Sequence, residues 1–564
     1  MVQAADGPDA AWITRLPQVL RGTGQGPLAG LSFAAKDNID VAGVPTTAGC
    51  PAFAYTPGQH AAVVQKLLDA GASMAGKTNL DQFACGLNGT RSPYGAVPNA
   101  FDARYVSGGS SSGSAYVVAS GQVDFALGTD TAGSGRVPAG LNNIVGLKPS
   151  RGLLSARGVV PAAQSVDCVS IFAGTVGLAA HVLAQALGHD PLDPYSRDLP
   201  LAQRAYPARF RFGVPEPLEF FGDLQARAAF ELAVQRLREL GGTPVAVDYA
   251  PLSKAADLLY GSALVAERYA AIRGFFDGRE QEVIDPVRSI VASGCAWSAA
   301  DYCEALVKLR TLGQAADRMW DRIEVLLVPT APTHYTIEQM RTDPVALNRN
   351  LGWYTNFVNL LDYAALSVPS SIRPDGLPFG ITFIGRCGSD WQLAELGQRY
   401  HHATGLPQGA TQVPLPEPVP IPGLAAARTV KVAVVGAHLS GMPLNTQLTE
   451  RGATLARKAQ TSADYRLYAL PGTKPPKPGL VRVAAGAGAP IALEIWDLPL
   501  EHYGSFVALI PPPLGIGTLT LADGGSVQGF LCEALATQGA QDITHHGGWR
   551  AYLASLAAPV AAPA

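Results

Sequence analysis

A proline-rich interruption divides this chain. Between Leu406 and Gly423 the sequence reads LPQGATQVPLPEPVPIPG. Proline lacks the N–H group that helices and central strands need, and proline-rich segments favour extended, semi-rigid conformations. A chain of 564 residues also exceeds the roughly 250–300 residues at which single hydrophobic cores stop growing. We therefore predict two domains, 1–408 and 429–564, joined by a linker over 409–428.

The two parts differ in their patterns. Before the interruption, short apolar runs alternate with amphipathic stretches from Leu31 to about Tyr400. This alternation is typical of a β-sheet covered by helices, so we predict a large α/β domain. After it, Thr429–Val435 reads as a new strand, and short strands and turns continue to about residue 555. We predict a smaller α+β domain there.

Composition excludes several classes of protein. A formal net charge of −3 does not provide the dense basic face that binds nucleic acid. The seven cysteines are scattered and lack metal-ligand spacing, which argues against zinc and a disulfide framework. No run approaches the 18 or so apolar residues of a membrane span, and the N-terminus does not read as a secretory signal. We expect a cytoplasmic protein that acts on a small molecule without metal or cofactor.

Glycine and small hydroxyl residues are concentrated in two clusters, Ser107–Ser114 and Gly128–Gly135. Such residues pack poorly in a core but allow backbone to approach a ligand closely. Neither cluster matches the phosphate-loop pattern GxxxxGK[ST] or the dinucleotide pattern GxGxxG. The first cluster alone is equally consistent with a flexible loop and with a functional site. Together the two clusters predict a functional site.

These clusters, GGSSSGS and GTDTAGSGR, resemble the signature of the amidase signature family. The likeness includes FAAKDNIDVAGVPTTAG (Phe33–Gly49) and AGKTNLDQFACG (Ala75–Gly86), in the family's order and spacing. It covers essentially the whole first domain. The resemblance implies a mixed β-sheet covered by helices, and an enzyme that hydrolyses an amide.

The resemblance also implies a catalytic relay of Lys36, Ser110 and Ser134, with Ser134 as the nucleophile. A serine hydroxyl needs a base within hydrogen-bond reach, and His60 is the only histidine between Lys36 and Ser134. A lysine can act as the base where burial lowers its pKa. Ser110 would pass the proton between the other two side chains, and the family resemblance implies a cis peptide bond between Gly109 and Ser110.

The same loop provides candidates for an oxyanion hole. The backbone N–H groups of Thr131, Ala132 and Gly133, with that of Ser134, could stabilise the tetrahedral intermediate. The sequence departs here from the family, because Ala132 stands where glycine is common and Gly135 replaces a bulkier residue. A methyl group at Ala132 is tolerated where its φ is negative.

A second resemblance concerns the substrate. Leu258–Ile272 reads as one helix, on which Tyr260 and Arg268 are close enough in phase to share a face. A helix arginine commonly pairs with a neighbouring carboxylate. The segment nevertheless resembles allophanate hydrolases, in which a tyrosine and an arginine hold the substrate carboxylate. In addition, VVGAHLSGMPLN (Val434–Asn445) resembles the start of the extra C-terminal domain of those enzymes.

This resemblance implies hydrolysis of allophanate (urea-1-carboxylate) to ammonia and carbon dioxide, by a homodimer. In some members the C-terminal domain is credited with a second step that uses the histidine matching His438. A histidine after a strand is more commonly a packed or capping residue.

Two other functions stay open. One is an amidase of another small amide, such as the glutaminase-type subunit of a tRNA-dependent amidotransferase, which would not need the second domain. The other is a non-enzymatic scaffold, against which the presence of Lys36, Ser110 and Ser134 together argues.

Overall fold

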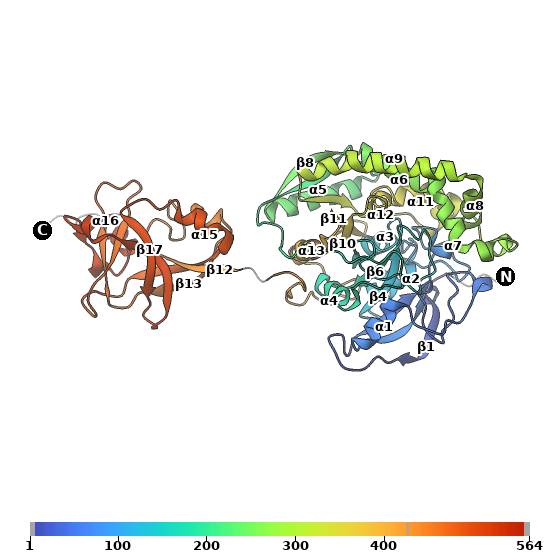
Figure 1. The fold of residues 1–564 in the computed structure, drawn as a ribbon, viewed down its shortest axis with the longest axis horizontal. Helices are drawn as coiled ribbons and strands as arrows, with labels where there is room; N and C mark the ends of the chain where they lie inside the picture. Colours follow the sequence, from blue (N-terminus) through green and yellow to red (C-terminus); the bar gives the residue numbers. More distant parts are fainter. Residues whose placement is uncertain (1–5, 426–427, 558–564) are drawn as a thin grey trace. The chain divides into compact units, whose positions relative to one another are not determined.

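The structure is a computed structural model that describes residues 6–425 and 428–557. It contains two compact units, Met1–Ala425 and Ala426–Ala564. Figure 1 shows the chain coloured from its N-terminus to its C-terminus, and the boundary between the units falls at the end of the proline-rich stretch.

The first unit is built on a mixed sheet of 11 strands. Strand β2 runs parallel to both of its neighbours, β3 and β4, whereas β4 pairs antiparallel with β6. The predicted α/β class with a mixed sheet is therefore confirmed. In spatial order the strands are β1 (Trp12–Leu20), β3 (Ser73–Thr78), β2 (Ser32–Lys36), β4 (Phe125–Asp130), β6 (Cys168–Ala173), β5 (Val145–Lys148), β10 (Ala364–Ile372), β11 (Pro378–Gly385), β9 (Val325–Pro329), β7 (Phe210–Glu216) and β8 (Gly242–Asp248).

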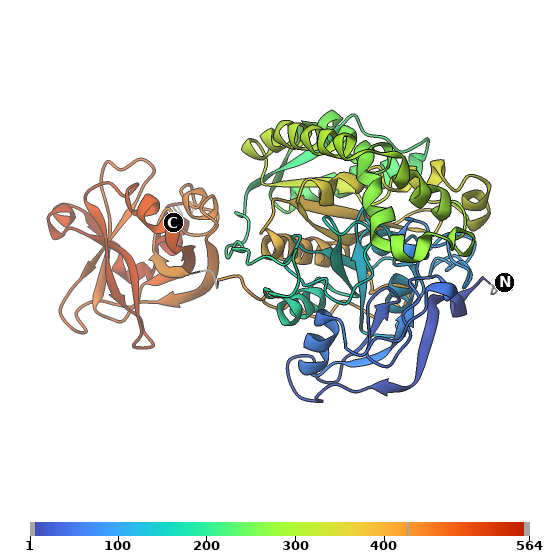
Figure 2. The ribbon, with the colours of Figure 1, turned by 45° about the vertical axis from the view of Figure 1, so that its right-hand side comes forward.

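Helices cover both faces of this sheet because alternate strand residues point to opposite sides. Phe33 and Phe125 lie in one apolar core, whereas Ala34 and Ala126 lie in another. The first core includes residues of α1 (Ala62–Asp69), α4 (Val176–Ala186), α5 (Leu224–Glu239) and α13 (Asp390–Thr404). On the other face lie α2 (Ser112–Ala119), α3 (Val137–Leu141), α6 (Ala250–Gly261), α9 (Ala299–Asp317) and α12 (Asn356–Leu360). Figure 2 gives a second view of these layers.

The remaining helices of the first unit belong to smaller apolar clusters. Helices α7 (Ala266–Phe276) and α8 (Val287–Ser293) pack with Phe83. Helices α10 (Ile337–Thr342) and α11 (Ala346–Leu351) pack with Val106. The second of these clusters therefore joins α10 and α11 to the residue that directly precedes the first Gly/Ser cluster.

The second unit contains two sheets and has its own apolar core. The predicted α+β class of this domain is confirmed. Its five-stranded sheet has the order β13 (Thr454–Gln460), β16 (Ala492–Pro499), β12 (Thr429–Val434), β18 (Ser526–Cys532) and β17 (Leu514–Thr520). Its three-stranded sheet has the order β15 (Pro478–Arg482), β14 (Tyr465–Ala469) and β19 (Gln541–Asp542), and its helices are α14 (Thr446–Thr449), α15 (Leu500–Val507) and α16 (Trp549–Ala557).

Much of the proline-rich stretch lies along the first unit. The N–H of Gly409 donates to the carbonyl of Asn143 at 3.1 Å, and that of Ala425 donates to the carbonyl of Gln203 at 2.7 Å. An extended proline-rich segment keeps its carbonyls and remaining N–H groups available for such contacts. The part of the predicted linker 409–428 that precedes residue 426 is thus a strap on the first unit and no free tether.

None of the helices in the described residues combines the length and apolar character needed to cross a membrane. Within 6–425 and 428–557, no three His, Cys, Asp or Glu side chains are grouped closely enough to hold a metal ion.

Candidate active site

Lys36 is held between two hydroxyl groups at the end of β2. Its side chain is fully buried. The Nζ atom lies 2.7 Å from Ser110 Oγ and 2.7 Å from Thr129 Oγ1. The parallel pairing of β2 with β4 brings Lys36 and Thr129 to the same edge of the sheet. The first link of the predicted relay, from Lys36 to Ser110, is present in the structure.

Burial brings the pKa of Lys36 close to neutral pH, as its predicted role as a base requires. Removal of the ammonium group from water lowers the pKa of Lys36 from 10.5 to about 7. The carboxylates of Asp81, Asp167 and Asp130 oppose this shift, whereas the Arg268 guanidinium adds to it. An appreciable fraction of the amine is therefore uncharged at pH 7 and available to accept a proton.

The segment that carries Ser110 has little freedom to move. The peptide bond between Gly109 and Ser110 is cis, as the family resemblance implies. A Cβ atom at Gly109 would lie 2.2 Å from Asp81 Oδ2, so only glycine fits there. The same carboxylate accepts the N–H groups of Gly89 at 3.1 Å and Arg91 at 2.9 Å. Asp81 thus supports this segment, a role that its place in the AGKTNLDQFACG motif hinted at but residue type alone did not identify.

Ser134 lies in the loop between β4 and α3 and is 2% exposed. Its hydroxyl donates to the carbonyl of Gly86 at 3.4 Å. Among the hydrogen bonds of the described residues, none joins Ser134 to Ser110, so the second link of the relay is not made in this structure. Catalytic hydrogen bonds in ligand-free enzymes are often long or poorly aligned and tighten when substrate binds.

Four consecutive backbone N–H groups, from Thr131 to Ser134, donate no hydrogen bond to any other described residue. They precede and include the predicted nucleophile. Buried N–H groups are normally paired with an acceptor. This run therefore suits the predicted oxyanion hole, because an oxyanion is the acceptor that such donors lack.

Both departures from the family pattern fit their surroundings. Ala132 is not among the residues with positive φ, so the loop accommodates its methyl group. Gly133 has a φ of +141°, and a Cβ atom there would lie 2.3 Å from Thr355 Oγ1. At Gly135, a Cβ atom would lie 2.4 Å from the Cβ of Ser170. The backbone of this loop is packed too closely for larger residues at 133 and 135.

A buried ion pair links the two ends of the loop between β4 and α3. Arg136 donates to both carboxylate oxygens of Asp130, at 2.9 and 3.0 Å. Burial alone would raise the pKa of Asp130, but the Arg136 guanidinium holds it below its ordinary value. Asn359 joins the pair, since its amide accepts from Arg136 at 3.2 Å and donates to the carbonyl of Asp130 at 2.7 Å. The two ends of the loop between β4 and α3 are thereby fixed to each other and to α12. This loop, residues 131–136, is called the nucleophile loop below, after the predicted nucleophile Ser134.

The predicted helix over Leu258–Ile272 is wrong. The chain forms two helices, α6 and α7, separated at Ser262, whose backbone is extended. The Ser262 hydroxyl accepts the N–H of Leu264 and starts a new helical turn. Tyr260 and Arg268 therefore do not share one helix face. The break still brings them together, because Arg268 Nη2 donates to the Tyr260 hydroxyl at 3.0 Å.

Arg268 has donor groups to spare. Its side chain is 4% exposed, and its Nε and Nη1 atoms have no hydrogen-bond partner among the described residues. Within those residues it also forms no ion pair with a carboxylate, the fate expected of an ordinary helix arginine. Leaving buried donors unpaired is costly, and a guanidinium pairs best with a carboxylate that accepts two parallel hydrogen bonds. Arg268 is thus a candidate anion-binding group, and its charge lowers the pKa of Lys36.

His438 lies in the second unit, in a largely aromatic setting. Its Nε2 is 2.9 Å from Gln447 Oε1. The imidazole stacks on Phe530, with ring centres 5.0 Å apart, and meets the edge of Phe506. Burial lowers the pKa of His438, so the ring is neutral at pH 7.

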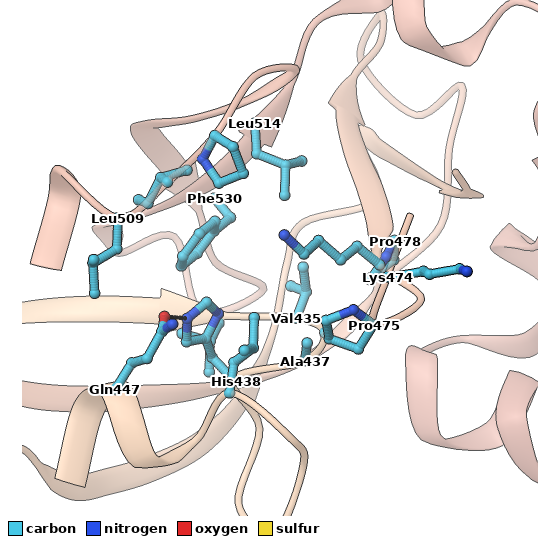
Figure 3. A pocket seen from close by; sticks show the side chains of 16 residues that line it. Val435, Ala437, His438, Gln447, Lys474, Pro475, Pro478, Leu509, Leu514 and Phe530 are labelled. Atoms are coloured by element: carbon cyan, nitrogen blue, oxygen red, sulfur yellow. Dashed lines mark hydrogen bonds between the residues drawn. The ribbon is translucent and has the colours of Figure 1, made fainter. Parts of the chain in front are cut away.

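His438 and Gln447 also line a pocket of about 170 Å³, shown in Figure 3. Lys474 and Lys477 contribute to its wall, whereas most of the remaining lining is apolar. The pocket therefore combines a neutral imidazole with positive charge from two lysines.

The chain matches two family models: Amidase over residues 10–394, and Allophanate hydrolase C-terminal domain over residues 430–554. The solved structure of Kluyveromyces lactis allophanate hydrolase is 42% identical, covers 97% of this chain and 94% of that one, and has a TM-score of 0.76. The urea amidolyase of Saccharomyces cerevisiae is 44% identical over 94% of this chain, but this chain spans only 30% of its length. A glutamyl-tRNA(Gln) amidotransferase subunit from Synechococcus is 34% identical over 69% of this chain and 87% of its own length.

Proposed function

The chain belongs to the amidase family, and on that premise we propose that it is an amidohydrolase that converts allophanate to ammonia and carbon dioxide. The observation that carries this proposal is the buried Arg268 guanidinium, two of whose nitrogen donors have no partner among the described residues, in the surroundings of Lys36. Allophanate is a short amide with a carboxylate at one end. Likeness to an allophanate hydrolase along nearly the whole chain supports the same substrate.

The reaction begins with proton transfer through the relay. The neutral amine of Lys36 accepts a proton from Ser110 while Ser110 accepts one from Ser134, whose oxygen attacks the terminal carbamoyl carbon. The N–H groups of the loop from Thr131 bind the resulting oxyanion. The relay then returns a proton to the nitrogen as the C–N bond breaks, and ammonia leaves.

The acyl group on Ser134 is then hydrolysed with the help of the same relay. Water gives a proton to the relay and attacks the acyl carbon, and Ser134 regains its proton as N-carboxycarbamate departs. That product loses carbon dioxide, and the carbamate left behind breaks down to ammonia and carbon dioxide. The sum is two ammonia and two carbon dioxide for each allophanate.

Arg268 and Tyr260 would hold the other end of the substrate. Arg268 Nε and Nη1 can donate to the two carboxylate oxygens, while Nη2 stays bonded to the Tyr260 hydroxyl. Such anchoring places the carbamoyl carbon at one position in front of Ser134 and lowers the entropy cost of the attack. A glutaminase function is less well supported, since the amidotransferase relative leaves about a third of this chain unmatched.

We expect Arg268→Met to raise KM for allophanate by roughly 10²-fold, because two charge-assisted hydrogen bonds to a buried carboxylate are lost. Hydrolysis of malonamide, a neutral amide of similar length, should change little. The measurement is ammonia release from allophanate, malonamide and glutamine by the purified chain and the variant.

The matched control is Arg273→Met, which removes an arginine from the same helix whose side chain is 69% exposed. It should behave as the wild type. Equal losses on allophanate and malonamide in the Arg268 variant would contradict carboxylate recognition, and wild-type preference for glutamine would contradict the proposed substrate.

A role for the second unit in decarboxylation is supported by the pocket around His438. N-carboxycarbamate carries two negative charges, which Lys474 and Lys477 would attract, and its nitrogen must gain a proton as the C–N bond breaks. Among the residues that line the pocket, His438 has the side chain best suited to transferring a proton near neutral pH.

We expect His438→Ala to slow the second step by roughly 10²-fold, or to its spontaneous rate if that is faster, with the first step unchanged. Carbon-13 NMR of labelled allophanate would then show N-carboxycarbamate accumulating before the second ammonia appears. His502→Ala, an exposed histidine of the same unit, is the control. Identical time courses for both variants and the wild type would remove the second unit from the chemistry.

A homodimer and a cytoplasmic location are also proposed. The first rests on the family resemblance, and the second on the cysteine pattern and composition. Light scattering of the purified chain tests the first.

A further inference from the structure

The segment Ser165–Asp167 lies between the nucleophile loop and the helix that carries Arg268. Its first residue contacts α7: the N–H and the hydroxyl of Ser165 donate to the two carboxylate oxygens of Glu267, at 3.0 and 2.7 Å. Glu267 directly precedes Arg268 in the chain. Tyr302 adds a third hydrogen bond to the same carboxylate, at 2.8 Å. One end of the segment is thus tied to the residue next to the anion-binding group.

The other end of the segment contacts the nucleophile loop. The Thr131 hydroxyl donates to Asp167 Oδ1 at 2.5 Å. Asp167 also accepts the N–H groups of Ala162 at 2.8 Å and Ala163 at 3.1 Å, which fix the orientation of its carboxylate. Thr131 begins the run of unpaired N–H groups that ends at Ser134. The position of this run therefore depends on Asp167.

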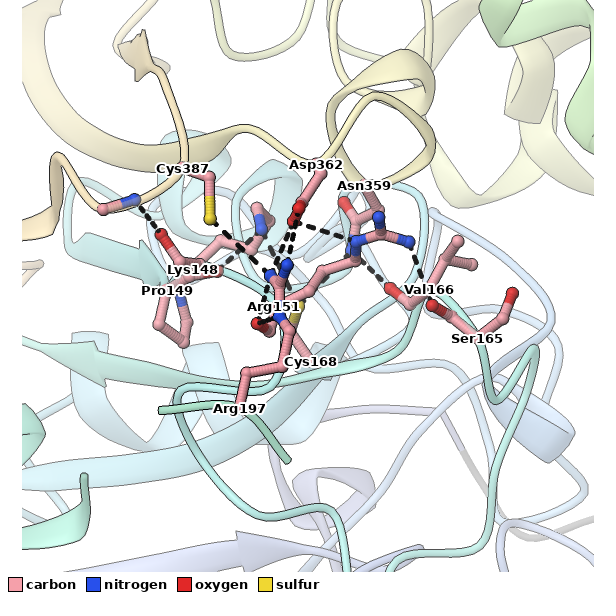
Figure 4. A network of polar contacts seen from close by, with 12 residues as sticks. Lys148, Pro149, Arg151, Ser165, Val166, Cys168, Arg197, Asn359, Asp362 and Cys387 are labelled. Atoms are coloured by element: carbon pink, nitrogen blue, oxygen red, sulfur yellow. Dashed lines mark hydrogen bonds and ion pairs between the residues drawn. The ribbon is translucent and has the colours of Figure 1, made fainter. Parts of the chain in front are cut away.

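The segment between these ends is itself held in place. Figure 4 shows Arg151 and Asn359 donating to successive carbonyls, that of Ser165 at 3.0 Å and that of Val166 at 3.0 Å. Immediately after the segment, Cys168 begins β6 and pairs with Asp130 of β4. A segment with fixed carbonyls and a strand at one end cannot easily change its length or direction.

We propose that Ser165–Asp167 is a strut that sets the spacing between Arg268 and Ser134, with Ser165 and Asp167 as positioning residues. The inference rests on the proposed function and adds what determines substrate length. The carboxylate of the substrate is held from α7 and its carbamoyl carbon is attacked from the nucleophile loop. One short segment is hydrogen-bonded to both elements, so it sets the distance between them. That distance is matched to a substrate in which two bonds separate the carboxylate carbon from the carbamoyl carbon.

The two ends of the strut are expected to give different kinetic effects. Ser165→Ala should raise KM for allophanate about 10-fold with kcat little changed, because it loosens α7 and Arg268. Ser165→Thr retains the hydroxyl and should restore KM. Thr131→Val and Asp167→Asn should each lower kcat by roughly 10–100-fold with KM little changed, because they loosen the oxyanion donors.

A double-mutant cycle tests whether Thr131 and Asp167 act through their shared hydrogen bond. If they do, the variant with both changes is no slower than the slower single variant. Multiplied effects would overturn the proposal, and so would an unchanged KM in Ser165→Ala. Thr131→Val keeps the loop's N–H groups and side-chain volume, so it supplies the test even where Asp167→Asn fails to fold.

Ser32→Ala is the matched control for Ser165→Ala, since the N–H and hydroxyl of Ser32 both donate to the carboxylate of Asp124, at 2.7 and 2.8 Å. This contact lies at the start of β2, whereas Lys36 ends that strand. If the wild type releases ammonia from another amide and not from allophanate, the proposed function fails. The cycle on that amide still confirms or rejects the strut.

Discussion

Ser134→Ala is expected to slow ammonia release from allophanate by roughly 10⁴–10⁶-fold, the loss typical of removing a serine nucleophile. No acyl-enzyme can form without the hydroxyl. The fold should remain intact, because within the described part of the chain that hydroxyl makes a single long hydrogen bond, to Gly86 at 3.4 Å. The measurement combines ammonia release with thermal unfolding of the same preparation.

Ser120→Ala provides the control for this variant. The Ser120 hydroxyl also donates to a backbone carbonyl, that of Tyr116 at 2.7 Å, but at the far end of α2. Its loss should leave the rate within about twofold of the wild type, because Ser120 is half-buried at the end of α2 opposite to the one that adjoins Ser110. If Ser134→Ala retains a tenth or more of wild-type activity, the covalent mechanism is wrong.

The second large effect concerns Lys36. Because its pKa is lowered to about 7 and the uncharged amine is the base, activity should be lost as pH falls below about 7. In that range kcat/KM should fall tenfold for each pH unit, and it should level off above pH 8. Lys36→Met removes the base and should lower kcat by roughly 10²–10⁴-fold. Lys36→Arg should be equally poor, since a guanidinium stays protonated.

The acid limb of the pH profile distinguishes this role from a structural one. It should vanish from the residual activity of Lys36→Met. It should persist in Lys66→Met, which removes a partly buried lysine whose Nζ donates to the backbone carbonyls of residues 186–188. An acid limb that survives unchanged in the Lys36 variant would assign the titration, and with it the base, to another group.

Short motifs were enough to predict the candidate reacting groups. Lys36, Ser110 and the loop from Thr131 to Ser134 lie within three motifs, and the structure brings the first two into contact. The two-domain division followed from composition and length, the α/β class from the apolar pattern, and the mixed sheet from the family resemblance. Both kinds of prediction depend on information that is local in the sequence.

The supporting residues could not be predicted in this way. Asp167 contacts Thr131 across 36 positions and Asn359 contacts Asp130 across 229, so only the fold brings each pair together. The Tyr260–Arg268 contact was anticipated for the wrong reason, since helical periodicity suggested one helix where Ser262 breaks the chain. Composition does not show what a segment packs against, so the contacts of the proline-rich stretch with Asn143 and Gln203 could not be predicted.

The close packing of Gly135 against Ser170 limits which substitutions these two positions can accept. Their Cβ positions would be 2.4 Å apart, so the two sites share the volume of a single side chain. A bulkier residue at 135 requires a simultaneous reduction to glycine at 170, and each change alone creates a clash or a void. Libraries that vary one codon at a time would miss every productive exchange here, whereas pairwise randomisation would sample them.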